Sequence, residues 1–129
     1  MLIVSKLHHI AIICSDYRKA RDFYTRILGF TILAEHYRPE RQSFKADLAI
    51  GGEYRIELFS FPNPPKRISY PEAAGLRHLA LEVEDLDQAL EWLEQNRVRH
   101  DGVRKDECTG KRFVFFYDPD DLPIECYEK

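Results

Sequence analysis

The chain has 129 residues, of which 44% are hydrophobic and 32% charged, and its formal net charge is −3. This length suits one compact domain, whereas each half alone would be a marginal folding unit. The ordinary composition and slightly acidic charge argue against a nucleic-acid partner. The amino-terminal residues MLIVSKLHH contain no long apolar run, so we expect neither a signal peptide nor a membrane span. We therefore expect a cytoplasmic protein.

The first half predicts a strand, a helix and three further strands. Residues 8–13 form an apolar segment typical of a strand, and Asp16 is suited to cap a helix whose apolar residues recur at helical spacing. Gly29 is placed to end that helix. Residues 30–61 then alternate apolar segments with turn residues, which is typical of an antiparallel meander.

The second half repeats this order. It predicts a strand at 78–83, a helix capped by Asp85 and ended by Asn96, strands at 98–103 and 112–117, a DPDD turn, and a last strand at 122–127. Residues 62–74, which are rich in proline, lie between the halves and predict a semi-rigid linker.

Each half carries a histidine at the start of its first strand and a glutamate inside its last strand. The pairs are His9 with Glu57 and His78 with Glu125. In a duplicated fold related by a pseudo-twofold axis, equivalent positions come together. Two imidazoles and two carboxylates suit a divalent metal ion and leave coordination positions free for water or substrate. Small residues two positions after each histidine leave room for such a site.

A structural role is the alternative for these four residues. A strand histidine taken singly is more often structural than a metal ligand. The glutamates favour a metal, because their apolar strands bury them and a buried carboxylate is costly unless it is paired or metal-bound. For Glu57 the competing partner is Arg55, two residues away on the same strand face. No comparable cation lies two residues from Glu125.

Cys14, Cys108 and Cys126 are predicted to be free thiols, because they are odd in number and form no CxxC pair. Cys126 follows Glu125 in a strand, so the two side chains face opposite sides of the sheet. Cys126 is therefore a poor candidate for a metal ligand.

The segments HHIAI, DFYTRILGF, RIELF, GLRHLALEV and FYDPDDLPIE occur along the chain in that order. In their order and spacing the chain resembles the glyoxalase I branch of the vicinal oxygen chelate (VOC) superfamily over nearly its whole length. More narrowly, it resembles the small bacterial YaeR-type glyoxalase-like proteins. Two departures are Asp121, where the family's final turn usually has glycine, and the proline-rich linker, which differs from that of glyoxalase I.

The resemblance implies an α+β fold of paired βαβββ modules that form a cupped mixed sheet. The modules would span about residues 5–61 and 75–128 and be joined by the linker 62–74 within one domain, 1–129. It also implies that His9, Glu57, His78 and Glu125 are the metal ligands. A homodimer is expected. In glyoxalase I itself each site takes half of its ligands from each subunit, and the sequence leaves open whether the site here is shared in this way or lies within one chain.

The activity that the resemblance implies is that of a metal-dependent lyase or isomerase similar to lactoylglutathione lyase. Its substrate would be a small α-hydroxycarbonyl compound or a hemithioacetal, such as a glutathione adduct. The reaction would pass through a metal-bound enediolate, and Glu125 or Glu57 would move the proton. Zinc and nickel suit the ligands best, and cobalt, manganese and iron also fit. Arg38, Lys66 and Arg67 are candidates for holding an anionic substrate. The alternatives are a VOC thiol transferase or dioxygenase, and a non-enzymatic small-molecule binding protein.

Overall fold

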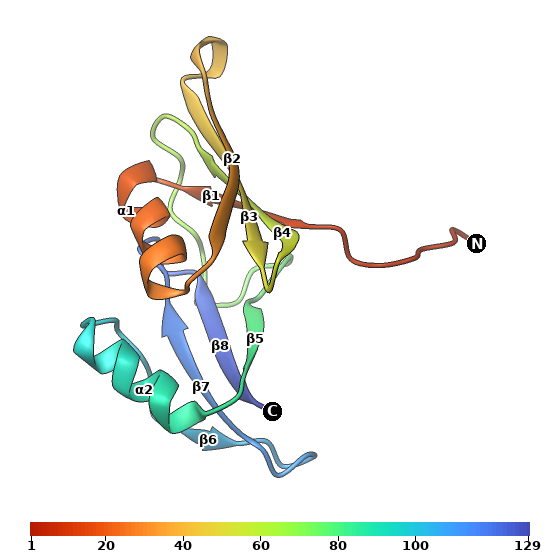
Figure 1. Ribbon diagram of the computed structural model, residues 1–129, viewed down its shortest axis with the longest axis vertical. Helices are drawn as coiled ribbons and strands as arrows, with labels where there is room; N and C mark the ends of the chain where they lie inside the picture. Colours follow the sequence, from red (N-terminus) through yellow and green to blue (C-terminus); the bar gives the residue numbers. More distant parts are fainter. The chain divides into compact units, whose positions relative to one another are not determined.

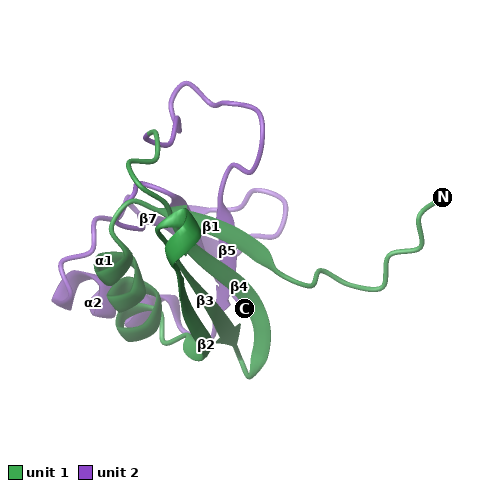
Figure 2. Ribbon diagram, turned by 90° about the horizontal axis from the view of Figure 1, so that it is seen from above, with its two compact units in different colours: residues 1–65 green, residues 66–129 purple.

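The computed structural model describes residues 1–129 as two compact units, which Figure 1 shows with their elements and Figure 2 shows in separate colours. Unit 1 is Met1–Pro65 and unit 2 is Lys66–Lys129. Each unit has one four-stranded mixed sheet and one main helical segment in the order βαβββ. The predicted α+β class and the repeated module are therefore confirmed. No helix combines the length and the apolar character needed to cross a membrane.

The sheet of unit 1 has the strand order β1-β4-β3-β2, with β1 parallel to β4 and the other neighbours antiparallel. Between β1 and β2 the chain forms an α-helix that continues directly into a π-helical turn, and a short 3-10 helix joins β2 to β3. The elements are β1 (Ile10–Cys14), α1 (Tyr17–Asp22), η1 (Phe23–Ile27), β2 (Thr31–Arg38), η2 (Pro39–Arg41), β3 (Ser43–Ile50) and β4 (Glu53–Ser60).

The sheet of unit 2 has the equivalent order β5-β8-β7-β6, again with one parallel pair, β5 with β8. Its elements are β5 (Leu79–Val83), α2 (Leu86–Gln95), β6 (Arg104–Lys105), β7 (Arg112–Tyr117) and β8 (Pro123–Glu128). The last strand of each module thus lies beside the first, as a duplicated module requires.

The helix signals in the sequence correspond to caps in the structure. The Asp16 side chain accepts a hydrogen bond from the backbone N–H of Lys19 at 3.1 Å, and the Asp85 side chain accepts one from Gln88 at 3.0 Å. Each bond satisfies one of the backbone donors that a helix leaves free at its first turn. Gly29 has a φ of 73°, the left-handed conformation that commonly ends a helix.

The predicted strand at 98–103 is wrong. This segment contributes only an isolated bridge between His100 and Phe116, and pairing with β7 begins at Arg104. The reason lies in Asp101 and Gly102, a pair that favours turns over extended ladders. Instead of extending a ladder, the Asp101 carboxylate accepts a hydrogen bond from the Tyr117 hydroxyl at 2.8 Å.

The first strand begins later than predicted. Pairing of β1 with β4 starts at Ile10 opposite Ile56 and runs to Cys14 opposite Ser60. His8 and His9 therefore precede the ladder and are not bound by its strict alternation of faces.

One face of each sheet is apolar and lies under the helix of its own unit, as Figure 1 shows for α1 and α2. The buried residues on these faces alternate along the strands with the residues of the opposite face, which carries the two candidate glutamates and, in unit 2, the aromatic residues Phe113 and Phe115. The buried residues are Ile12, Cys14, Ala46, Leu48, Ile56 and Leu58 in unit 1, and Leu79, Val114, Phe116, Ile124 and Cys126 in unit 2. The opposite face of each sheet is thus available for functional side chains.

Candidate metal site

In unit 1 the imidazole of His9 faces the carboxylate of Glu57. His9 Nε2 lies 2.9 Å from Glu57 Oε2, and the Glu57 side chain is 12% exposed. Glu57 lies in β4 directly opposite Ala11 of β1. Because Ala11 has only a methyl group, the space beside the carboxylate stays open.

Unit 2 repeats this arrangement with the same atoms. His78 Nε2 lies 3.1 Å from Glu125 Oε2, and the Glu125 side chain is also 12% exposed. Glu125 lies in β8 directly opposite Ala80 of β5. The internal repeat therefore conserves the pair and also the small residue across from each carboxylate.

The two pairs fit a divalent metal ion by donor type, because imidazole nitrogen and carboxylate oxygen are both ligands of such ions. The separations of 2.9 and 3.1 Å are those of direct His–Glu contacts, which hold the two donors of each pair side by side. No group of three or more potential ligands comes together within either unit, so each unit supplies two donors of the predicted four.

The other ring nitrogens of the two histidines differ. His9 Nδ1 lies 2.8 Å from Nδ1 of His8, a neighbour that reaches it because both residues precede β1. His78 Nδ1 is buried and has no hydrogen-bond partner. The two histidines therefore share the contact of Nε2 with a glutamate and differ at Nδ1.

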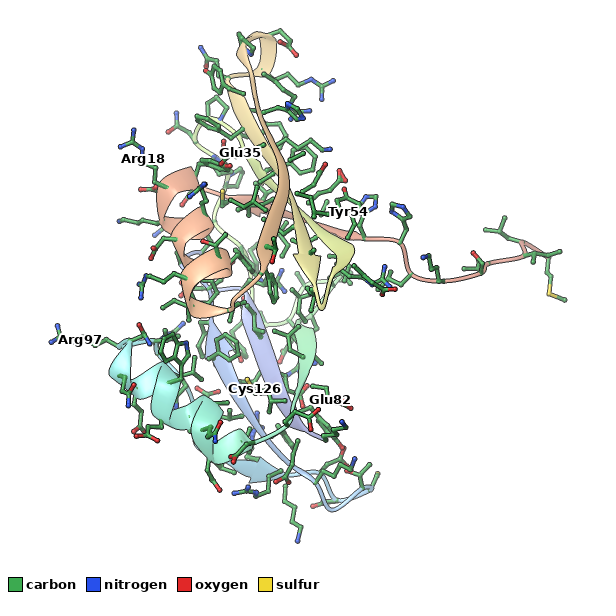
Figure 3. All side chains as sticks on the ribbon, viewed as in Figure 1. Arg18, Glu35, Tyr54, Glu82, Arg97 and Cys126 are labelled. Carbon is green, nitrogen blue, oxygen red and sulfur yellow. The ribbon has the colours of Figure 1, made fainter.

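Charged and polar side chains surround Glu57. The ammonium of Lys45 lies 3.5 Å from Glu57 Oε1 and 3.0 Å from Asp47 Oδ1, and the Tyr54 hydroxyl donates to Asp47 Oδ1 at 3.2 Å. The Tyr54 ring also contacts the His9 ring, with centroids 5.5 Å apart. Figure 3 shows Tyr54 beside β4, on the side of the sheet away from α1. A ring of contacts thus returns from His9 through Glu57, Lys45, Asp47 and Tyr54 to His9.

These contacts change the acidity of two groups. The hydrogen bond to Asp47 is the main cause that raises the pKa of Lys45, and the charges of Asp47 and Glu57 raise it further. Burial raises the pKa of Tyr54, and its hydrogen bond with Glu57 adds to this effect. Lys45 is therefore a fixed cation and Tyr54 a fixed neutral donor at neutral pH.

Aromatic side chains surround Glu125 instead. Phe115 of β7 lies directly opposite Glu125 and makes an edge contact with the His78 ring, with centroids 4.9 Å apart. The Arg104 guanidinium lies over the rings of Phe113 and Phe115, at 5.1 and 5.3 Å from their centroids. The two half-sites share their ligand pair but differ in the wall around it.

Arg55 is not the partner of Glu57, although the sequence offered it as the alternative. Its guanidinium donates to the Glu53 carboxylate and to the backbone carbonyl of Tyr54. The cation beside Glu57 is Lys45, from the neighbouring strand. Lys45, Asp47 and Tyr54 were not among the residues predicted from the sequence. The alternation of charged and apolar residues in FKADLA is the signal that could have identified the first two.

The three basic candidates for substrate binding lie in different settings. Arg38 donates to the Ser43 hydroxyl at 2.8 Å and lies over the Phe59 ring, while its Nε is buried without a partner. Arg67 donates to Ser69 and to the carbonyls of Leu76 and Arg77, so it fastens the linker to the start of β5. Lys66 is exposed.

Unit 2 contains a small, open pocket beside His78. Its wall includes Arg67, Tyr70, Arg104 and Phe115. The pocket therefore brings one predicted metal ligand and one predicted substrate-binding residue into a common wall, whereas Arg38 belongs to unit 1.

Comparison with known protein families identifies the class to which a protein with this fold and these two His–Glu pairs belongs. The family model of the Glyoxalase/Bleomycin resistance protein/Dioxygenase superfamily matches residues 6–126. The chain belongs to this superfamily. The four candidate ligands all lie within the matched range.

Two bacterial proteins are similar over their full lengths. The chain is 55% identical to the uncharacterized protein YaeR of Escherichia coli (strain K12), covering 100% of both chains. It is 54% identical to the uncharacterized protein YwkD of Bacillus subtilis (strain 168), covering 99% of this chain and 100% of that one. A solved structure of a glyoxalase family protein from Enterococcus faecalis is 42% identical, with a TM-score of 0.88 over 95% of this chain and 97% of that chain.

A more distant relative carries a named activity. Lactoylglutathione lyase of Escherichia coli O157:H7 is 28% identical over 127 residues, which cover 96% of this chain and 93% of that protein. The resemblance to the YaeR-type proteins inferred from the sequence is confirmed, and these similar proteins are themselves uncharacterized.

Proposed function

We propose that this protein is a metal-dependent lyase or isomerase that acts on a small α-hydroxycarbonyl compound, with hemithioacetals of glutathione as the first substrates to test. The observation that carries the proposal is the repeated pair of facing donors, His9 Nε2 with Glu57 Oε2 and His78 Nε2 with Glu125 Oε2, at 2.9 and 3.1 Å. The distant similarity to lactoylglutathione lyase supports the reaction class.

In this proposal His9, Glu57, His78 and Glu125 hold one divalent ion, zinc or nickel first and cobalt, manganese or iron as alternatives. Such an ion acts as a Lewis acid on adjacent substrate oxygens. Glu125 or Glu57 would take the proton from one carbon of the substrate and return it to the next. Ala11 and Ala80 leave the space that a substrate needs beside the carboxylates.

The two half-sites complete one site either within one chain or across a homodimer, and we propose the homodimer. Large apolar side chains are exposed in both units, which supports an uncovered interface. They include Leu2, Ile3, Leu7, Ile13, Leu33, Tyr37, Ile68, Tyr70, Leu76 and Trp92. We also propose that the protein is cytoplasmic, as expected from its sequence.

Metal content tests the proposal directly. Elemental analysis of the purified wild type should find about one equivalent of a transition metal per chain, and His9→Ala and His78→Ala should lose it. His36→Ala is the matched control, because His36 is an exposed histidine on β2, at the opposite edge of the sheet from β1. Wild-type protein that takes up no metal, even after incubation with zinc or nickel, would leave a binding protein as the better account.

Turnover tests the reaction. Glu125→Gln should remove isomerisation of the methylglyoxal–glutathione hemithioacetal while circular dichroism shows an intact fold, because an amide cannot accept the proton. An undiminished rate in this variant contradicts the assignment. Oxygen uptake by iron-loaded protein, or formation of a thiol–epoxide adduct, would instead indicate a dioxygenase or a thiol transferase.

A further inference from the structure

The internal repeat allows the two half-sites to be compared position by position. Asp47 and Phe115 each lie directly opposite a candidate metal ligand, Glu57 and Glu125 respectively. Two residues earlier on the same strands, Lys45 of unit 1 corresponds to Phe113 of unit 2. The wall of one half-site is therefore charged, and the wall of the other is aromatic.

Lys45 has a hydrogen-bond donor to spare. An ammonium group carries three N–H donors and no acceptor. Two of them are used by Asp47, at 3.0 Å, and by Glu57, at 3.5 Å. The side chain is 28% exposed, so the third donor is open to an incoming molecule.

Asp47 and Tyr54 hold Lys45 in place. The Asp47 carboxylate accepts from both the Lys45 ammonium and the Tyr54 hydroxyl, and Tyr54 is in turn packed against the rings of His8 and His9. A long lysine side chain loses its rotamer freedom when it is fixed, and here the neighbours already impose that cost before a substrate arrives. Such preorganisation is typical of a group that meets a ligand.

We propose that Lys45 donates its third N–H to a substrate oxygen other than the two that the metal ion takes. This inference rests on the proposed function and narrows its substrate class. The substrates would be α-hydroxycarbonyl compounds that carry a further oxygen acceptor, such as a carboxylate, next to the reacting pair. The aromatic half-site has no lysine at the corresponding position, which Phe113 occupies, and its nearby cation, Arg104, lies over the rings of Phe113 and Phe115.

Two small chelators test this inference by calorimetric titration of the zinc-loaded protein. Oxalate has two oxygens beyond its chelating pair, whereas acetohydroxamate has none. Lys45→Met should weaken oxalate binding by about tenfold to a hundredfold, the usual effect of losing a hydrogen bond to a charged group. Acetohydroxamate binding should change by less than about threefold, and Lys45→Arg should retain most of the oxalate affinity.

The affinity of the metal-free protein for zinc distinguishes two roles of Lys45, contact with the substrate and support of Glu57. This affinity should be equal in wild type and Lys45→Met. Lys111→Met provides a control with an exposed lysine of unit 2.

Equal loss of affinity for both chelators, or loss of zinc affinity, would show that Lys45 only positions Glu57 and would overturn the inference. Equal oxalate affinity in wild type and variant would also overturn it. A wild type that binds neither zinc nor nickel would overturn the proposed function itself, whereas a wild type that binds metal but shows no effect of Lys45→Met on oxalate would overturn only this inference. If Lys45→Met does not fold, Lys45→Gln takes its place.

Discussion

Ala11 and Ala80 are the small side chains beside the two candidate ligands Glu57 and Glu125. Each lies directly across from a glutamate of the neighbouring parallel strand. A larger side chain at either position would fill the space beside the carboxylate. The same residue type at both positions fits a duplicated module in which both copies need that space.

At the same scale, Glu57 and Glu125 show that equivalent residues can have different surroundings. Glu57 lies near a lysine and Glu125 lies across from a phenylalanine. One carboxylate thus has a charged neighbour and the other an aromatic one. This difference is the physical basis for expecting the two glutamates to have separate roles.

The cysteines permit a prediction about single residues. Burial raises the pKa of Cys126 to about 11, with a smaller contribution from the charge of Glu125, so at pH 8 about one molecule in a thousand carries the reactive thiolate. Cys14 is fully buried, and Cys108 is exposed. We expect a disulfide reagent at pH 8 to modify one thiol of the folded protein rapidly and all three in urea.

Cys108→Ser provides the control, since it should abolish the rapid phase and leave two thiols that react only on unfolding. Rapid reaction of two or more thiols in the folded wild type would contradict the burial of Cys14 or Cys126.

At the scale of elements, Glu35 connects the sheet of unit 1 to α1. Its carboxylate accepts hydrogen bonds from the Tyr17 hydroxyl and from Arg21 Nε. The bond from Tyr17, followed by the bond from Arg21, lowers the pKa of Glu35 below its usual value of 4.5. A carboxyl group with a lower pKa in the folded state stabilises the fold fully above its unfolded pKa, and this contribution is lost as the pH falls below it.

Glu35→Gln should therefore be less stable than wild type in urea at neutral pH. The difference in the free energy of unfolding should shrink as the pH falls from about 5 to about 3, because the wild-type carboxylate becomes protonated. Glu40→Gln, in the exposed turn η2, is the control and should follow the wild-type pH profile. A gap between wild type and Glu35→Gln that stays constant down to pH 3 would show that the ionised form of Glu35 is not what stabilises unit 1.

The turn before β8 shows how an element tolerates a departure from the family pattern. Asp118 is buried, and its carboxylate accepts from the backbone N–H groups of Asp120 and Leu122 at 2.8 and 2.9 Å. Asp121 stands where the family usually has glycine, and it adopts a φ of 65°. Aspartate enters this left-handed region at lower cost than most residues, so the turn keeps its form.

At the scale of the whole molecule, each unit supplies only two of the four predicted ligands, and apolar side chains are exposed in both units. We therefore expect a homodimer. Light scattering at micromolar concentration should give twice the 15.2 kDa mass of one chain. A monomer that still binds one metal ion per chain would instead place all four ligands of a site in one polypeptide.

Much of this protein follows from the sequence alone. Hydrophobic periodicity, capping aspartates and the repeated His and Glu positions predicted the βαβββ order, the helix ends and the candidate ligands, because these signals are local and each half repeats them. The segment at 98–103 was mispredicted, because its apolar residues suggested a strand while Asp101 and Gly102 favoured a turn.

Only the tertiary structure decided which side chains surround each carboxylate. Lys45 and Glu57 are twelve positions apart and meet because β3 and β4 pair antiparallel in one particular register. The sequence offered Arg55, which is nearer along the chain, but strand pairing brought Lys45 to Glu57. Neighbours within a strand can be read from alternation, whereas neighbours across strands depend on the register, which turns and packing establish together.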